Sequence, residues 1–176
     1  MPHVAVTAVG VDRPGIVAAV TGVLLEHGGN LEDTAMTRLG GHFAMVLVVE
    51  VAEDASSLER ALVTVGEPLG LTVTVRPIAE ADVASDDGAA WAVTVHGADR
   101  PGIVHRVTTL LADHGANIVD LATRQLTTDA GTGYVVLLEV LLPPGADDTA
   151  LDTALQALAA DLGVDVHLRP DEPDYL

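Results

Sequence analysis

Two copies of one short segment carry the residues that are best suited to binding a small ligand. The first copy is Asp12-Arg13-Pro14-Gly15-Ile16-Val17, and the second is Asp99-Arg100-Pro101-Gly102-Ile103-Val104. Each copy lies between a predicted strand and a predicted helix. The first turn of a helix has unpaired N–H groups and a partial positive charge, which together favour a carboxylate. An aspartate beside those amides can hold the ammonium group of the same ligand.

The residue types also predict which amides are free. Arg13 precedes a proline and is disfavoured in the helical region, so we expect it to be the N-cap and Pro14 to be the first helical residue. The free donors are then the amides of Gly15, Ile16 and Val17. Gly15 has no side chain, so a ligand can approach its backbone closely. The corresponding candidates in the second copy are Asp99, Pro101, Gly102 and Ile103.

The repeat extends beyond these segments and sets the number of domains. Each predicted helix is followed by a matching turn, His27-Gly28-Gly29-Asn30 in the first half and His114-Gly115-Ala116-Asn117 in the second. All of these matches keep one constant interval, which indicates a duplicated unit. We expect the first domain over residues 1–80, a linker over 81–89, the second domain over 90–170 and a flexible acidic tail over 171–176.

The hydrophobic pattern of each half predicts the order strand, helix, strand, strand, helix, strand. Valine- and threonine-rich runs predict the strands, and apolar residues spaced by three and four predict the helices. In the first half the expected elements are 4–9, 14–27, 31–39, 43–51, 55–69 and 71–75. In the second half they are 91–95, 101–114, 117–126, 133–142, 147–162 and 164–168.

This order predicts an α/β (α+β) fold made of two ferredoxin-like βαββαβ sandwiches. Right-handed crossovers place both helices of each half on one face of a four-stranded antiparallel sheet. The other face is apolar enough that we expect it to be covered, either by the other half or by another chain.

Composition excludes several classes of function. The 176-residue chain has a formal net charge of −18, from 26 acidic and 8 basic residues, so we expect no direct binding to nucleic acid. There is no cysteine, which excludes disulfides and thiolate metal sites. We find no signal peptide and no apolar run long enough to span a membrane, and we expect a soluble cytoplasmic protein.

No catalytic, metal or cofactor site is predicted. His96, Asp99 and His105 are close in sequence, but their spacing matches no zinc pattern. The three serines lie at a helix start and in the linker, and neither a Gly-x-Ser-x-Gly motif nor a phosphate-binding loop is present. His27 and His114 are expected to be helix C-terminal residues.

The Asp-Arg-Pro-Gly-Ile-Val segment, followed by Gly-x-Asn at the next strand, resembles the ACT domain, a regulatory module that binds amino acids in many families. Two such domains without a catalytic partner resemble the glycine cleavage system transcriptional repressor family, most closely over residues 6–17, 29–34 and 39–43. The resemblance implies a non-catalytic amino-acid sensor that modulates transcription through a protein partner such as a DNA-binding regulator. Glycine or serine is the expected ligand, and a homodimer is possible.

The resemblance also bears on the two asparagines. Connectivity alone places Asn30 near the opposite end of the helix from Asp12. In pairs of ACT domains the two ends meet across an interface, so the resemblance implies that Asn117 joins Asp12 and Gly15, and that Asn30 joins Asp99 and Gly102.

Two alternatives remain open from the sequence. The repeated segments can be tight turns without a ligand, because glycine, proline and asparagine are common in turns for local reasons. The chain would then be a ligand-free interaction module, or a regulatory subunit of a metabolic enzyme.

Overall fold

The computed structural model describes residues 2–52, 54–79, 88–128 and 131–171. The chain divides into two compact units, Met1–Ala84 and Ser85–Leu176, each with a hydrophobic core of its own. Residues 81–87 of the predicted linker and 172–176 of the predicted tail lie outside the described residues.

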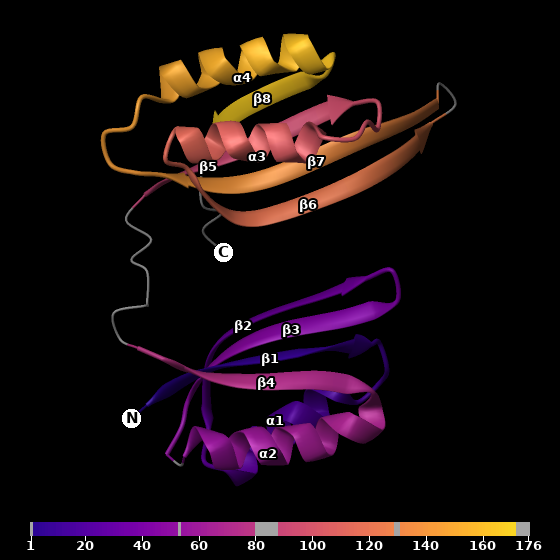
Figure 1. Ribbon diagram of the computed structural model, residues 1–176, viewed down its shortest axis with the longest axis vertical. Coiled ribbons are helices and arrows are strands. Elements are labelled where there is room, and N and C mark those ends of the chain that lie inside the picture. Colours follow the sequence, from indigo (N-terminus) through magenta and orange to yellow (C-terminus); the bar gives the residue numbers. More distant parts are fainter. Residues whose placement is uncertain (1, 53, 80–87, 129–130, 172–176) are drawn as a thin grey trace. The chain divides into compact units, whose positions relative to one another are not determined.

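The first unit has two helices on one face of a four-stranded sheet (Figure 1). The sheet order is β2-β3-β1-β4, and every strand pair is antiparallel. Its elements are β1 (His3–Val11), α1 (Ile16–Glu26), β2 (Asn30–Leu39), β3 (His42–Glu50), α2 (Ala55–Gly66), the 3₁₀ turn η1 (Glu67–Leu69) and β4 (Leu71–Ile78).

The second unit repeats this architecture, with the antiparallel sheet order β6-β7-β5-β8. Its elements are β5 (Ala89–Gly97), α3 (Ile103–Asp113), β6 (Asn117–Thr128), β7 (Gly131–Leu142), α4 (Asp148–Leu162) and β8 (Asp165–Pro170). The predicted mixed α/β (α+β) fold, with two ferredoxin-like sandwiches and four-stranded antiparallel sheets, is confirmed.

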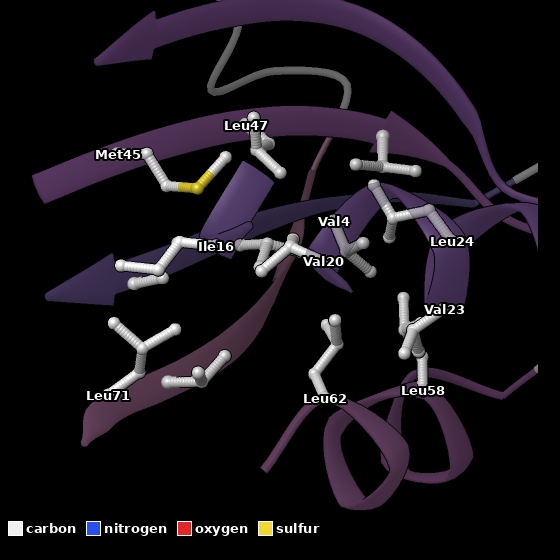
Figure 2. Packing of buried hydrophobic residues seen from close by; sticks show 14 of the residues in the cluster. Val4, Ile16, Val20, Val23, Leu24, Met45, Leu47, Leu58, Leu62 and Leu71 are labelled. Carbon is white, nitrogen blue, oxygen red and sulfur yellow. The ribbon is translucent and has the colours of Figure 1, made fainter. Parts of the chain in front are cut away.

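Each core lies between the helices and the inner face of the sheet. Burial alternates along β1, where Val4, Val6 and Ala8 are buried and the residues between them are not. Figure 2 shows Val4 among side chains of α1 and β3, with Leu62 of α2 close by. The period-two burial of β1 therefore comes from the single helix-covered face.

The outer face of the first sheet carries several exposed apolar side chains. Val9 and Val11 on β1 are 50% and 51% exposed, and Val46 on β3 is 48% exposed. The expectation that this face is covered by other protein stays a prediction.

Several predicted boundaries differ from those of the structure, and three of them have clear local reasons. The first helix begins at Ile16 with Gly15 as its N-cap, instead of at Pro14 with Arg13 as N-cap, because Gly15 has φ 94°, which is not helical. The second helix ends at Gly66 and continues only as a 3₁₀ turn containing Pro68, whose ring interrupts regular helix. The predicted turn at 127–132 is shorter, since β6 extends to Thr128 and β7 begins at Gly131.

Candidate functional site

The residues between each first strand and first helix form a bend that we call the corner: residues 12–15 in the first unit and 99–102 in the second. The corner glycines have the same backbone conformation, with φ 94° and ψ −7° at Gly15 and φ 93° and ψ −8° at Gly102. A Cβ atom added to either glycine would meet no atom within 4 Å. Both corners are therefore open on the side of the glycine.

The three residues that follow each corner glycine in the sequence have free main-chain amides. The first intrahelical bond of α1 runs from the amide of Ala19 to the carbonyl of Gly15, at 2.9 Å. The amides of Ile16, Val17 and Ala18 precede that bond, and none of them donates to another described residue. The helical donor set is thus shifted by one residue from the predicted Gly15, Ile16 and Val17, because the helix starts later than expected.

The same arrangement occurs in the second unit. The amide of Arg106 donates to the carbonyl of Gly102 at 3.0 Å, and the three amides before it have no acceptor within the described part of the chain. Ile16 and Ile103 are each only 2% exposed. These isoleucines anchor their helices in the cores.

The corner aspartates are held by side chains that the sequence prediction missed. Oδ2 of Asp12 accepts a hydrogen bond from Nη1 of Arg38 on β2, at 3.2 Å. Oδ2 of Asp99 accepts one from Nε2 of Gln125 on β6, at 2.8 Å. Arg38 and Gln125 occupy the same place in the repeat, and that equivalence was the available signal. The first corner thus joins a carboxylate and a guanidinium, whereas the second has a neutral amide.

A main-chain bond fixes the first corner against the neighbouring hairpin. The amide of Asp12 donates to the carbonyl of Gly41 at 3.0 Å, in the turn between β2 and β3. Asp12 is therefore positioned by the hairpin as well as by Arg38, while Pro14 and Gly15 remain exposed.

The structure does not bring Asn30 or Asn117 to the corner of its own unit. Asn30 pairs with Glu50 at the end of the sheet where β1 begins, whereas Val11, next to the corner, pairs with His42 at the other end. A ten-residue strand such as β2 spans about 30 Å. Asn117 likewise pairs with Leu141, at the end of the sheet where β5 begins. The role expected for these asparagines remains a prediction.

The histidines at the helix ends have a structural partner. Nδ1 of His27 lies 2.9 Å from the carbonyl oxygen of Val23, and Nδ1 of His114 lies 2.8 Å from that of Leu110. A carbonyl oxygen only accepts, so Nδ1 carries the proton in both rings. Both residues are helix C-caps, as predicted.

One carboxyl group elsewhere has a shifted pKa. Hydrogen bonds from the side chain and the amide of Ser56 hold the pKa of Asp54 below its usual value. Asp54 lies at the start of α2, which follows the end of β3 opposite the corner. This shift therefore concerns the helix start and not the candidate site.

Among the described residues, no group of three or more histidine and acidic side chains is placed to hold a metal ion. No helix in those same ranges is long and apolar enough to cross a bilayer. What the corners offer is binding chemistry: main-chain donors for a carboxylate and an aspartate for an ammonium group.

Comparison with known proteins bears on both units. The sequence pattern of the ACT domain family matches residues 3–76 and residues 92–169. The chain is 28% identical over 163 residues to the glycine cleavage system transcriptional repressor of Escherichia coli (strain K12), covering 91% of this chain and 85% of that protein.

Two other relatives match one unit or both. A UPF0237 protein of Methanopyrus kandleri is 43% identical over 79 residues, which is 43% of this chain and 88% of that one. The solved structure of an unknown protein from Galdieria sulphuraria has a TM-score of 0.83 and 32% identity, covering 97% of this chain and 99% of that chain.

Proposed function

The chain belongs to the ACT domain family as a tandem of two such domains, and we propose that it is a non-catalytic cytoplasmic regulator that senses a small amino acid at its corners. In each unit the ligand carboxylate would bind the free amides behind Gly15 or Gly102. Its ammonium group would bind Asp12 or Asp99. The open space beside both glycines suits a small ligand such as glycine or serine.

The observation that carries this proposal is the duplicated corner itself. Both glycines hold a left-handed conformation within one degree of each other in φ and ψ, and both leave the following amides unpaired. If the corner were only a turn, there would be no reason for both copies to keep an aspartate, Asp12 or Asp99, together with unpaired amides. In the first unit, Arg38 adds a cation at the corner through its ion pair with Asp12.

The regulatory part of the proposal concerns transcription through a protein partner. The E. coli relative is named as a transcriptional repressor of the glycine cleavage system. The net charge of −18 opposes direct contact with DNA, so we place a DNA-binding regulator between this chain and the promoter. Ligand binding would act by favouring one arrangement of the protein over another.

The test is a thermal unfolding series of the full chain with each of the twenty amino acids. A ligand that binds only the folded state adds about 2.7 kcal/mol of stability at a concentration 100-fold above its Kd. We expect glycine or serine to raise the melting temperature, and the Asp12→Asn and Asp99→Asn substitutions together to reduce that rise. If no amino acid shifts the transition of the unmodified chain, the proposal is wrong.

A matched control removes a carboxylate that is not at a corner. Glu26 is the last residue of α1, at the opposite end of that helix from Gly15. Glu26→Gln changes the net charge as Asp12→Asn does, and we expect the ligand-induced shift to be unaffected. An equal loss in both variants would mean that overall charge, and not the corner, governs binding.

A further inference from the structure

A row of four side chains crosses the outer face of the second sheet, away from the helices. Arg169 on β8 pairs in register with Ala92 on β5, Ala92 pairs with Glu139 on β7, and Glu139 pairs with Asp120 on β6. On β5 and β7 the neighbours Val93 and Leu138 are buried on the helix side, so Ala92 and Glu139 point away from it.

The row lines a hollow of about 250 Å³. The hollow exists because the side chains of Ala92 and Ala122 are small. Arg124 and Asp171 also line it. One water molecule takes about 30 Å³ in the liquid, so the hollow has room for a ligand of a few heavy atoms.

The charged groups around the hollow do not neutralise one another. Among the described residues, Arg169 and Glu139 make no ion pair or side-chain hydrogen bond, and the same is true of Asp120 and Arg124. Adjacent strands lie about 4.8 Å apart. Because β5, which carries Ala92, lies between β7 and β8, the backbones of Glu139 and Arg169 are about 10 Å apart. A cation and an anion thus face each other across a gap that an alanine leaves empty.

The first unit provides an internal comparison. The equivalent row there is Arg76, Ala5, Val48 and Asp33, paired in the same register. Val48 stands where the second unit has Glu139, so the carboxylate next to the alanine is missing. The carboxylate next to the alanine is therefore a property of the second unit, and not of the repeated fold.

We propose that this hollow is a separate ligand site of the second unit, one that binds the zwitterion of an α-amino acid. Arg169 takes the carboxylate, and Glu139 with Asp120 takes the ammonium group, in charge-assisted hydrogen bonds. Three carboxylates and two guanidiniums line the hollow, and this excess of negative charge disfavours acidic amino acids. The inference rests on the proposed function in one respect, since both require an amino acid as the ligand.

Isothermal titration of the full chain with glycine and with serine tests the site. We expect Glu139→Val and Arg169→Gln each to weaken one set of binding sites by at least about tenfold, because a charged hydrogen-bond partner is lost. Arg76→Gln in the first unit is the matched control and should bind as the unmodified chain does. Glycinamide, which lacks the carboxylate, and N-acetylglycine, which lacks the ammonium group, should not bind at the hollow.

The outcomes separate this inference from the proposed function. If Glu139→Val and Arg169→Gln bind with the same heats and affinities as the unmodified chain, the hollow is not a site, while the corner proposal stands. If these variants lose binding and Asp12→Asn with Asp99→Asn does not, the hollow is the site and the corners are not. If the unmodified chain binds neither glycine nor serine, the inference is overturned, and the series of twenty amino acids decides the proposed function.

A direct readout places the ligand independently of affinity. In amide NMR spectra of the unmodified chain, glycine should shift the resonances of Ala92 and Thr94 on β5, and those shifts should disappear in Glu139→Val. Valine is the residue at this place in the first unit, so we expect the variant to keep its fold, as circular dichroism would show. Shifts confined to the corners would contradict the inference.

Discussion

Gly15 and Gly102 hold backbone angles that other residues adopt only under strain. At a φ near +93° the Cβ atom of an L-residue crowds its own carbonyl group, even though the surrounding space is open. The glycines are therefore required by conformation and not by packing. The corner keeps its shape because of its main-chain angles, and its openness to a ligand is a consequence.

We expect Gly15→Ala and Gly102→Ala each to lower the free energy of unfolding by about 1–2 kcal/mol, the strain of a left-handed non-glycine residue. Gly22 is the matched control, because it lies inside α1, has no positive φ and has open space around its Cβ position. Gly22→Ala should stabilise the protein by about 0.5–1 kcal/mol. Chemical denaturation measures all three, and a neutral Gly15→Ala would show that the corner is not strained.

Arg38 and Gln125 show why part of the site was missed from the sequence. Asp12, Gly15 and their repeats were identified because they form one continuous segment. Arg38 reaches Asp12 from the far end of β2, and only the pairing of β2 with β3 brings the two together. Contacts of this kind depend on sheet register, which the local pattern does not specify.

The residue types at a helix end predict its position well in some helices and poorly in others. Asp147 was predicted as the first residue of the last helix, and it is the N-cap of α4, where Oδ1 accepts the amide of Ala150 at 2.9 Å. The start of α1 was wrong by two residues because Pro14 is as well suited to a turn as to a first helical position. The types of the elements and their order along the chain were predicted correctly, since the hydrophobic period and the repeat both determine them.

The cap of α4 gives a second measurable prediction. Asp147→Ala removes the side-chain acceptor for Ala150, and we expect a loss of about 1 kcal/mol in the unfolding free energy. Asp147→Asn keeps an acceptor at the same position and should cost much less. Urea unfolding followed by far-ultraviolet circular dichroism distinguishes them, and equal losses would mean that the charge, and not the cap, stabilises this helix.

The hollow on the second sheet could not be predicted from the sequence either. Asp120, Glu139 and Arg169 come from three strands, and Ala92 lies on a fourth. In the sequence each is a single charged or small residue on a strand. Only the register of four strands places them in one row.

For the whole molecule, the two separate cores predict separate responses to mutation. Leu62 is 1% exposed in the first core and Leu155 is 0% exposed in the second. Either leucine replaced by alanine should cost about 2–5 kcal/mol in its own unit. The single tryptophan, Trp91, packs against the second core, so its fluorescence reports on that unit.

We therefore expect Leu155→Ala to lower the midpoint of the tryptophan-detected transition, and Leu62→Ala to leave it unchanged. Circular dichroism, which detects both units, should reveal the loss in either variant. If Leu62→Ala moves the tryptophan signal as much as Leu155→Ala does, the units unfold as one cooperative body.

The agreement of the two corners and the divergence of the two sheet faces have a consequence for the history of the chain. A duplicated gene starts with two identical halves, and each later change is recorded as a difference between them. Here the backbone at both corners has stayed the same, while the position of Val48 in one half is occupied by Glu139 in the other. The bend is then the inherited property, and the carboxylate of Glu139 arose in the second half, or its counterpart was lost from the first, after the halves began to evolve apart.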